Sequence, residues 1–317
     1  VYAETDVDPD NQGGYVVWVA IADVATYVTP GSAMDKEARK RGNSVYMPDR
    51  VVPMLPERLS NDLCSLREHE DRPCMAVRMQ IDAKGKKQGH KFVRGMMRSA
   101  AKLSYQQAQG IFDAQAVAGS DNSSQGTSAR AGLDDILGTL WQAYQLMAQA
   151  RDARAPLIID KPERRIDMNE QGAITRIYIP PRLEAHRLIE EMMIAANVCA
   201  AETLETRQVP LLFRVHDAPP PERMHALADF IKSMGAHLDL GQPVVPDLFN
   251  RIMAETRDSE HYPTISEAVL RTQSQAVYTP ENIGHFGLNL GRYAHFTSPI
   301  RRYADLIVHR ALIRALK

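Results

Sequence analysis

The amino-acid sequence predicts an α+β fold, in which helices pack against a β-sheet. Strand-like segments gather in the first third of the chain: residues 15–24 form an apolar, β-branched run, and residues 75–81 and 89–97 flank a Lys-Gly-Lys-Lys turn. Most later segments carry helical periodicity instead. Strands and helices that are segregated along the chain are typical of α+β domains. We therefore expect an early sheet that later helices cover.

The first helix has a recognisable start and stop. Ser32 suits the N-cap, Asp35 lies at the capping-box position three residues on, and Gly42 suits the residue that follows a helix. The proline-containing residues 43–66 predict an ordered, extended loop. Further helices are expected over residues 104–114, 133–151, 182–206, 220–234, 247–255, 267–275 and 299–316, and further strands over 174–179 and 209–215.

Composition narrows the class of protein. The chain has 317 residues, 44% of them hydrophobic and 24% charged, so it can bury one large core or two ordinary ones. Its net charge of −1 means that an anionic partner such as RNA would have to meet a local concentration of positive charge. Three cysteines without metal-ligand or disulfide spacing predict free thiols in a reducing compartment. No segment is long and apolar enough to span a membrane, so a cytoplasmic protein is expected.

The segment HFTSPIRRYADLIVHR, residues 295–310, predicts a helix with an anion site at its start. Ser298 suits the N-cap and Pro299 the first helical position, where its missing N–H costs nothing. Thr297 and Ser298 would then lie at the positive end of the helix dipole.

Two arginines in the same segment point to the same chemistry. Arg301 and Arg302 would occupy the first helical turn, where the dipole disfavours cations. A phosphate is the natural compensating anion. The alternative is a pair of arginines that are solvated or bound by carboxylates of the protein itself. His309 in the same helix is interpreted as a structural histidine.

Two other groups of residues could contact a ligand. Glu190 and Glu191 interrupt an apolar helical pattern, but they project about 100° apart and cannot easily share a metal ion. A single contact from Glu190 or Asn197 to a ligand hydroxyl is the better interpretation. Tyr46 follows a basic helix end and could stack on a base, or could be an ordinary half-buried packing residue.

Several enzyme classes lack their motifs in this chain. There is no G-x-S-x-G elbow for a serine hydrolase, no H-E-x-x-H for a zinc protease, and no Gly-Lys-Ser/Thr to complete a P-loop. An unrelated phosphate-binding metabolic enzyme remains a distant alternative.

Six segments together resemble the RNB catalytic domain of the ribonuclease II/ribonuclease R family, and its ribonuclease R branch most closely. They occur in family order across nearly the whole chain. The segments are VAIADVATYV (19–28), RGNSVYMPDRVVPMLPERLSNDLCSL (41–66), AKLSYQQAQ (101–109), RLIEEMMIAANVCAA (187–201), RVHDAP (214–219) and HFGLNLGRYAHFTSPIRRYADLIVHR (285–310).

This resemblance implies an α+β RNB domain over residues 1–317, with a mixed sheet and helices around a central RNA channel. It implies a processive 3′→5′ hydrolytic exoribonuclease that uses Mg²⁺ and releases nucleoside 5′-monophosphates from single-stranded RNA. Arg301 falls on the family's catalytic arginine, and Tyr46 on an aromatic that stacks on a terminal base. The residues expected to contact RNA are Tyr46, Tyr105, Glu190, Asn197, Thr297, Ser298 and Arg302. We expect a monomer with no membrane partner.

The sequence departs from the family in ways that bear on activity. The family's metal-binding aspartates, D-x-x-x-x-D-x-D-D-A, would lie before Val1, and Asp6, Asp8 and Asp10 match the variable turn after that motif. We therefore expect no metal site in this chain and no turnover by the chain alone. Ile158 replaces a second stacking aromatic of some members, and the flanking cold-shock and S1 domains are not in the sequence.

Two further expectations concern an insertion and the alternative function. The Gly-, Ser- and Ala-rich residues 116–132 predict a flexible surface insertion. An RNB domain that binds RNA as a scaffold or regulator, without hydrolysis, is the alternative function.

Overall fold

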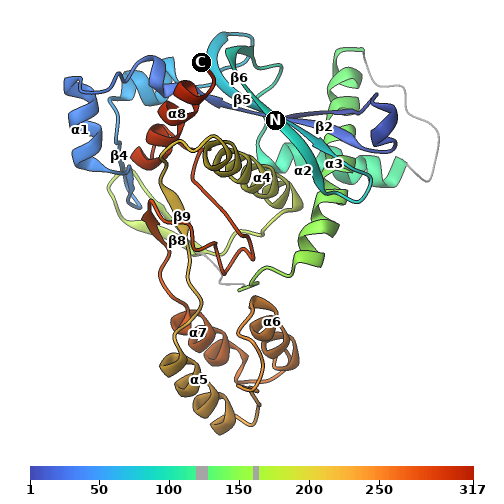
Figure 1. Cartoon of the computed structure of the whole chain (residues 1–317), viewed down its shortest axis with the longest axis vertical. Helices are drawn as coiled ribbons and strands as arrows, with labels where there is room; N and C mark the ends of the chain where they lie inside the picture. The colour runs from blue at the N-terminus through green and yellow to red at the C-terminus, as the bar shows by residue number, and fades with distance from the viewer. Residues whose placement is uncertain (119–127, 160–163) are drawn as a thin grey trace. The chain divides into compact units, whose positions relative to one another are not determined.

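A computed structural model describes residues 1–118, 128–159 and 164–317 of the chain (Figure 1). The chain divides into two compact units. The first comprises Val1–Ala150, Glu163–Leu211 and His295–Lys317, and the second comprises Arg151–Pro162 and Leu212–Ala294.

The first unit is built on a four-stranded antiparallel sheet in the order β1-β2-β5-β6. Its long strands pair in register, with Val19 opposite Val77 and Val77 opposite Phe92. These three apolar side chains are buried in the core of the first unit. The α+β class is confirmed, whereas the sheet is antiparallel and not mixed as predicted. The strands are β1 (Tyr2–Thr5), β2 (Tyr15–Ala22), β5 (Asp71–Ile81) and β6 (Lys87–Arg98).

Helices and short elements complete the first unit. α4 packs on both β2 and α8 (Figure 1). The helices are α1 (Ala33–Arg41), α2 (Tyr105–Ala118), α3 (Ser128–Arg154), α4 (Glu184–Thr206) and α8 (Tyr303–Ala315). The short elements are η1 (Pro9–Asn11), η2 (Val24–Thr26), the π-helix η3 (Arg58–Leu63), and strands β3 (Val45–Tyr46), β4 (Val51–Val52), β7 (Arg165–Met168) and β8 (Ile174–Tyr178).

The ends of the helices can be compared with the ends that the sequence predicted. The α1 caps are confirmed: the Asp35 N–H donates to Ser32 Oγ at 3.1 Å, and Gly42 has a φ of 72°. α2 continues to Ala118 and α3 begins at Ser128, so helices occupy residues 116–118 and 128–132 at the two ends of the expected insertion. Residues 119–127 of that insertion lie outside the described residues.

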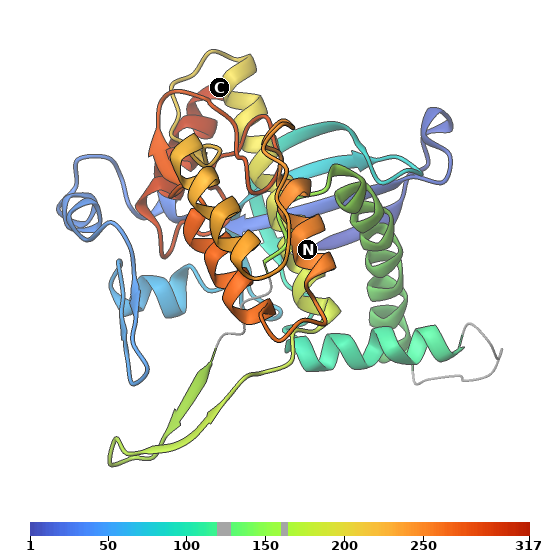
Figure 2. The ribbon, with the colours of Figure 1, turned by 90° about the horizontal axis from the view of Figure 1, so that it is seen from below.

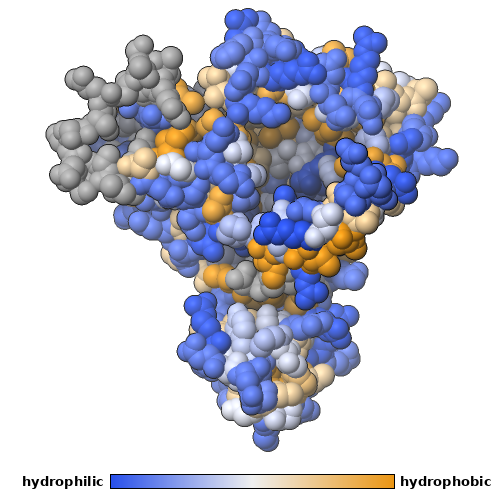
Figure 3. Space-filling model, turned by 180° about the vertical axis from the view of Figure 1, so that it is seen from behind, coloured by the Kyte–Doolittle hydropathy of each residue, from blue (hydrophilic) through white to orange (hydrophobic). Residues whose placement is uncertain are grey.

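The hairpin of β7 and β8 projects from the rest of the first unit (Figure 2). Strand β7 was not predicted from the sequence. Ile174 and Ile177 of β8 are more than half exposed. The face of the molecule drawn in Figure 3 is largely hydrophilic, and its exposed apolar side chains form separate patches.

The second unit is a small helical unit with a two-stranded sheet. β9 (Phe213–Val215) pairs antiparallel with β10 (Val277–Thr279). Three helices enclose an apolar core that includes Leu227, Phe249 and Ile265. These helices are α5 (Pro221–Ser233), α6 (Pro246–Glu255) and α7 (Tyr262–Thr272). Each starts with a proline in its first turn, where no N–H partner is needed.

The three cysteines are buried and unpaired, as predicted. Burial raises the pKa of the Cys64 thiol to about 11 and that of Cys199 to about 12. Both thiols are therefore protonated at neutral pH and are poor nucleophiles. Among the described residues, no helix is long and apolar enough to cross a bilayer.

The second unit should lose stability in mild acid because of His285. Burial, and then the nearby His216, lowers the pKa of His285 from 6.5 to about 4. Between these values the unfolded chain binds a proton that the folded chain does not, so stability is complete above pH 6.5 and falls toward pH 4. The loss is at most about 3 kcal/mol.

Urea unfolding at pH 4.5 to 8, followed by far-UV circular dichroism, measures this loss. Tryptophan fluorescence would miss it, since Trp18 and Trp141 both belong to the first unit. His285→Gln removes the titrating ring and should flatten the acid limb relative to the wild type. Identical pH profiles for the two proteins would contradict the assignment.

Candidate functional site

The turn before α8 is held by side chains of the protein itself. The helix begins at Tyr303, so the predicted start at residue 299 with Ser298 as N-cap is wrong. The N–H groups of Phe296 and Thr297 donate to Asn197 Oδ1 at 2.7 and 3.2 Å. The Ser298 N–H donates to Asp305 Oδ1 at 2.7 Å. Because these donors already have acceptors, the turn is not the open anion site at a helix start that we predicted.

Arg302 binds a carboxylate of the protein. Its Nε and Nη2 donate to the two oxygens of Asp305, both at 2.8 Å, and Asp305 is 0% exposed. The bidentate pair gives Arg302 the compensating anion that the sequence left open. The carboxylate-paired alternative is therefore confirmed for Arg302.

The neighbouring residue, Arg301, differs from Arg302 in its ion pairing. Within the part of the chain that the structure describes, no acidic side chain pairs with its guanidinium, which is exposed. Its backbone is nevertheless fixed, because the Ser44 N–H donates to the Arg301 carbonyl at 3.0 Å. The turn thus presents one free guanidinium from a rigid backbone.

Arg301 lines a pocket of about 390 Å³ with Tyr46, Thr297 and Ser298. The ring of Tyr46, on the short strand β3, is 62% exposed. The predicted stacking residue Tyr46, the predicted hydroxyl side chains of Thr297 and Ser298, and the free Arg301 therefore meet at one pocket. The remaining lining residues are Ala20, Ile21, Ala22, Ser60, Cys64, Ser65, Leu66, Pro299 and Ile300.

A second pocket of the first unit, about 590 Å³, adjoins the first. Both are lined by Ala20 and Leu66, so the two spaces share a wall. Tyr105 lines the second pocket and stacks on His186, with ring centroids 3.9 Å apart. Tyr105 therefore lies in a pocket that adjoins the pocket of Arg301, and not in that pocket itself.

Two other predicted residues lie away from both pocket linings. Glu190 is half exposed and forms an ion pair with Arg182, while Glu191 is buried. The two carboxylates do diverge, as helix geometry predicts. Asn197 is buried and positions the backbone of residues 296–297 rather than facing solvent.

The described residues do not fit a catalytic metal. They contain no group of three or more His, Cys, Asp or Glu side chains that could hold an ion. Asp6 is taken up by Asn11 and Gln80, which donate to its Oδ2 at 2.9 and 3.3 Å. We therefore derive no metal-dependent step for this chain.

Sequence reasoning missed the residues that hold α8 in place. Asp35 accepts hydrogen bonds from the Tyr303 hydroxyl at 2.8 Å and from Arg310 at 2.7 Å. Both partners are more than 260 positions from Asp35, so no local pattern indicates them. Asp305 had one local signal, since an acid three residues after an arginine can pair with it on a helix. His309 is structural, as predicted: its Nε2 lies 2.8 Å from the Phe296 carbonyl.

A basic side chain beside an exposed aromatic ring is a combination that proteins use to bind single-stranded nucleic acid. The chain belongs to the RNB domain family, whose model matches residues 3–317. This is a family of 3′→5′ exoribonucleases, and the predicted family is confirmed.

Known proteins support this assignment over most of the chain. Ribonuclease R of Vibrio cholerae is 42% identical and that of Escherichia coli 41% identical, each over 95% of this chain. The chain spans only 36% of the length of either relative. Among solved structures, Mycoplasma genitalium RNase R in complex with ribose methylated single-stranded RNA matches with a TM-score of 0.87 and 29% identity, over 98% of this chain and 47% of that one.

Proposed function

We propose that the full-length protein carrying this chain is a Mg²⁺-dependent hydrolytic exoribonuclease that degrades single-stranded RNA processively from its 3′ end to nucleoside 5′-monophosphates. One observation carries the proposal. Arg301 has no acidic partner among the described residues and shares its pocket with the exposed ring of Tyr46. Ribonuclease R relatives and an RNA-bound neighbour support it.

Four residues of the pocket, together with Tyr105 and Glu190 outside it, have roles in this proposal. Tyr46 stacks on a base near the 3′ end, since a base presents a flat π-face to an aromatic ring. Arg301 binds the scissile phosphate and stabilises the negative charge that grows there in the transition state. The hydroxyls of Thr297 and Ser298 donate to phosphate oxygens, and Tyr105 and Glu190 contact the neighbouring nucleotide, Glu190 through ribose hydroxyls. A contact to the 2′-OH would select RNA over DNA.

Ribonucleases of the RNB family are metal-dependent. A bound Mg²⁺ would supply the attacking hydroxide, but the described residues do not form its site. For this chain by itself we therefore expect RNA binding without hydrolysis. The second candidate function is an RNB domain that binds RNA as a scaffold or regulator.

The purified chain should bind a short single-stranded RNA, and Tyr46→Ala should weaken binding about tenfold because one stacking contact is lost. Fluorescence anisotropy with a labelled decamer measures the affinity. Tyr46→Phe is the matched control, since it keeps the ring and should bind like the wild type. A DNA decamer of the same sequence tests for selection by the 2′-OH.

Two results would contradict these expectations. Release of mononucleotides by the chain in Mg²⁺ would show that it is active by itself. Equal RNA affinity of the wild type and Tyr46→Ala would remove Tyr46 from the binding site. In the full-length protein, RNA binding without any mononucleotide release would favour the scaffold function over the exoribonuclease.

A further inference from the structure

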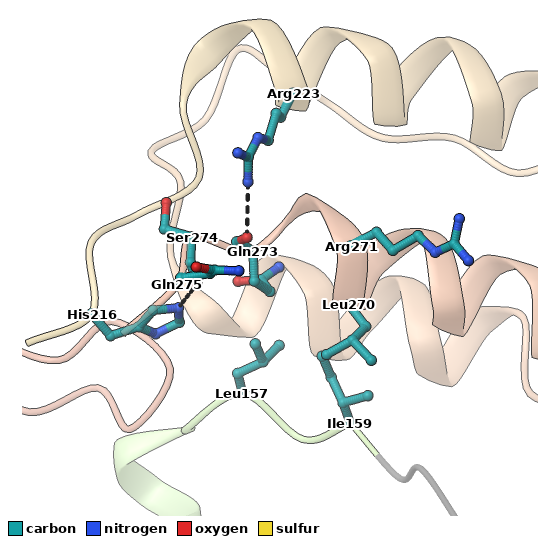
Figure 4. Close-up of a pocket in the computed structure, with 9 residues that line it drawn as sticks. All are labelled: Leu157, Ile159, His216, Arg223, Leu270, Arg271, Gln273, Ser274 and Gln275. Atoms are coloured by element: carbon teal, nitrogen blue, oxygen red, sulfur yellow. Dashed lines mark hydrogen bonds between the residues drawn. The ribbon is translucent and has the colours of Figure 1, made fainter. Parts of the chain in front are cut away.

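The second unit contains a pocket of its own, about 580 Å³ in volume (Figure 4). Apolar side chains form one side, with Leu157, Ile159 and Leu270 grouped together, and Arg223 of α5 reaches toward the pocket from the opposite side. The other lining residues are His216, Arg271, Gln273, Ser274 and Gln275. The volume is in the range of sites for small organic ligands.

Hydrogen bonds fix the walls of this pocket. The N–H of Leu157 donates to the Gly287 carbonyl at 2.8 Å, and the N–H of Ile158 donates to Asn250 Oδ1 at 2.8 Å, so the apolar wall is anchored. The Gly287 N–H donates to His216 Nδ1 at 2.8 Å. His216 Nδ1 is therefore unprotonated, and Nε2–H donates to the Ser274 carbonyl at 2.8 Å. A preformed pocket loses little entropy when a ligand binds.

Two lining residues have unused hydrogen-bonding capacity. Gln273 donates through Nε2 to the Val269 carbonyl at 3.0 Å, while its Oε1 is buried and accepts no hydrogen bond within the part of the chain that the structure describes. A buried acceptor without a donor costs free energy. Because Oε1 is fully buried, a turn of the Gln273 side chain must bring it to the pocket, where a ligand N–H would recover that cost. Arg223 uses only Nη1, which donates to the Gln273 carbonyl at 3.0 Å. Its Nε and Nη2 can still bind an anion.

The apolar wall, the bare acceptor and the arginine together define a ligand. It has a flat apolar part to lie on Leu157, Ile159 and Leu270, an N–H group for Gln273 Oε1, and an anionic group for Arg223. We propose that this pocket binds a nucleoside 5′-monophosphate whose base carries an amino group. The choice of a nucleotide among such compounds rests on the proposed function, because nucleoside 5′-monophosphates are the product of that reaction.

In this complex the base lies against the apolar wall and its exocyclic amino group donates to Gln273 Oε1. The phosphate accepts from Nε and Nη2 of Arg223. The pocket is separate from the pocket of Arg301 and Tyr46, with which it shares no lining residue. It retains a released nucleotide and takes no part in the cleavage itself.

Isothermal titration of the whole chain with AMP tests the proposal. Arg223→Ala should weaken AMP binding at least tenfold, because the arginine's bonds to the phosphate are lost. Arg251→Ala is the matched control: Arg251 is an exposed arginine on α6 whose side chain pairs with Asp247 and does not line the pocket. Leu270→Trp, which fills the pocket and leaves Arg223 in place, should also abolish binding. Thermal unfolding of each variant shows whether it is folded.

Ligand variants separate the contacts. Purine riboside 5′-monophosphate lacks the amino group and should bind several-fold more weakly than AMP, a difference that Gln273→Met should erase. Inorganic phosphate that binds as tightly as AMP would overturn the nucleotide assignment. AMP binding that Arg223→Ala and Leu270→Trp leave unchanged would overturn the site, as would the absence of AMP binding at millimolar concentration.

The outcome is independent of the RNA-binding pocket. AMP binding that is lost in Tyr46→Ala and kept in Arg223→Ala would place the nucleotide at the other pocket and overturn the proposal. If Tyr46→Ala binds AMP normally while Arg223→Ala does not, the proposal stands. It stands even where RNA binding by the chain fails, so the two proposals fail separately.

Discussion

Replacing Arg301 by alanine in the full-length protein is expected to lower kcat by roughly 10²–10³-fold, the usual cost of losing one preorganised group at a developing charge. Arg301 is exposed, borders the pocket of Tyr46 and has no acidic partner within the described residues. Its loss should therefore leave the fold intact. RNA affinity should fall much less than kcat, because the arginine's main contact strengthens in the transition state. Single-turnover release of mononucleotides from a 3′-labelled RNA measures the effect.

Two control variants show whether the effect is specific to the guanidinium of Arg301. Arg301→Lys keeps a positive charge but not the planar fork, and should recover only part of the rate. Arg50→Ala removes another exposed arginine, one with a long 3.8 Å contact to Asp49, and should be nearly as active as the wild type. If Arg301→Ala lost affinity and kept kcat, Arg301 would be a binding residue and not a catalytic one.

Asp305→Asn is expected to destabilise the chain by about 3–5 kcal/mol, because it leaves a mostly buried guanidinium without its counter-ion. Asp305 is fully buried, and Arg302 is only 21% exposed. The side chain of Asp305 also accepts the Ser298 N–H through Oδ1. Asparagine keeps this acceptor, so the loss of stability reports the unpaired charge of Arg302. Urea unfolding followed by the fluorescence of Trp18 and Trp141, both in the first unit, measures the loss.

Comparison variants separate charge from packing. Asp49→Asn alters an exposed carboxylate and should change stability by less than about 0.5 kcal/mol. Adding Arg302→Met to Asp305→Asn removes the uncompensated charge and should recover part of the loss. A double variant that is no more stable than Asp305→Asn would mean that the unpaired charge does not cause the destabilisation.

The elements that sequence reasoning predicted well are those whose causes are local. Residues 15–22 form a buried strand because nearly every side chain in the run is apolar, and α1 ends where Gly42 follows it. The α+β class and the buried free cysteines follow from such patterns, whereas the family was predicted from the resemblance of six segments. The same is true of the divergence of Glu190 and Glu191, which depends only on helix geometry.

The errors occurred where distant residues compete with a local signal. Ser298 and Pro299 read as a helix start, but the helix begins at Tyr303, whose N–H donates to the Gly42 carbonyl. Asn197 reads as a ligand contact, but its amide oxygen accepts the N–H groups of residues about 100 positions away. No window of sequence contains both partners of these bonds.

The contrast between Arg301 and Arg302 shows the division most clearly. The sequence determines that two arginines stand side by side in an RNB-family segment, and it assigns the catalytic position to Arg301 by resemblance. Only the folded chain distinguishes them physically. The buried carboxylate of Asp305 accepts hydrogen bonds from Nε and Nη2 of Arg302, whereas Arg301 lines the pocket of Tyr46. The distinction depends on which way each side chain leaves a turn, and tertiary packing sets that direction.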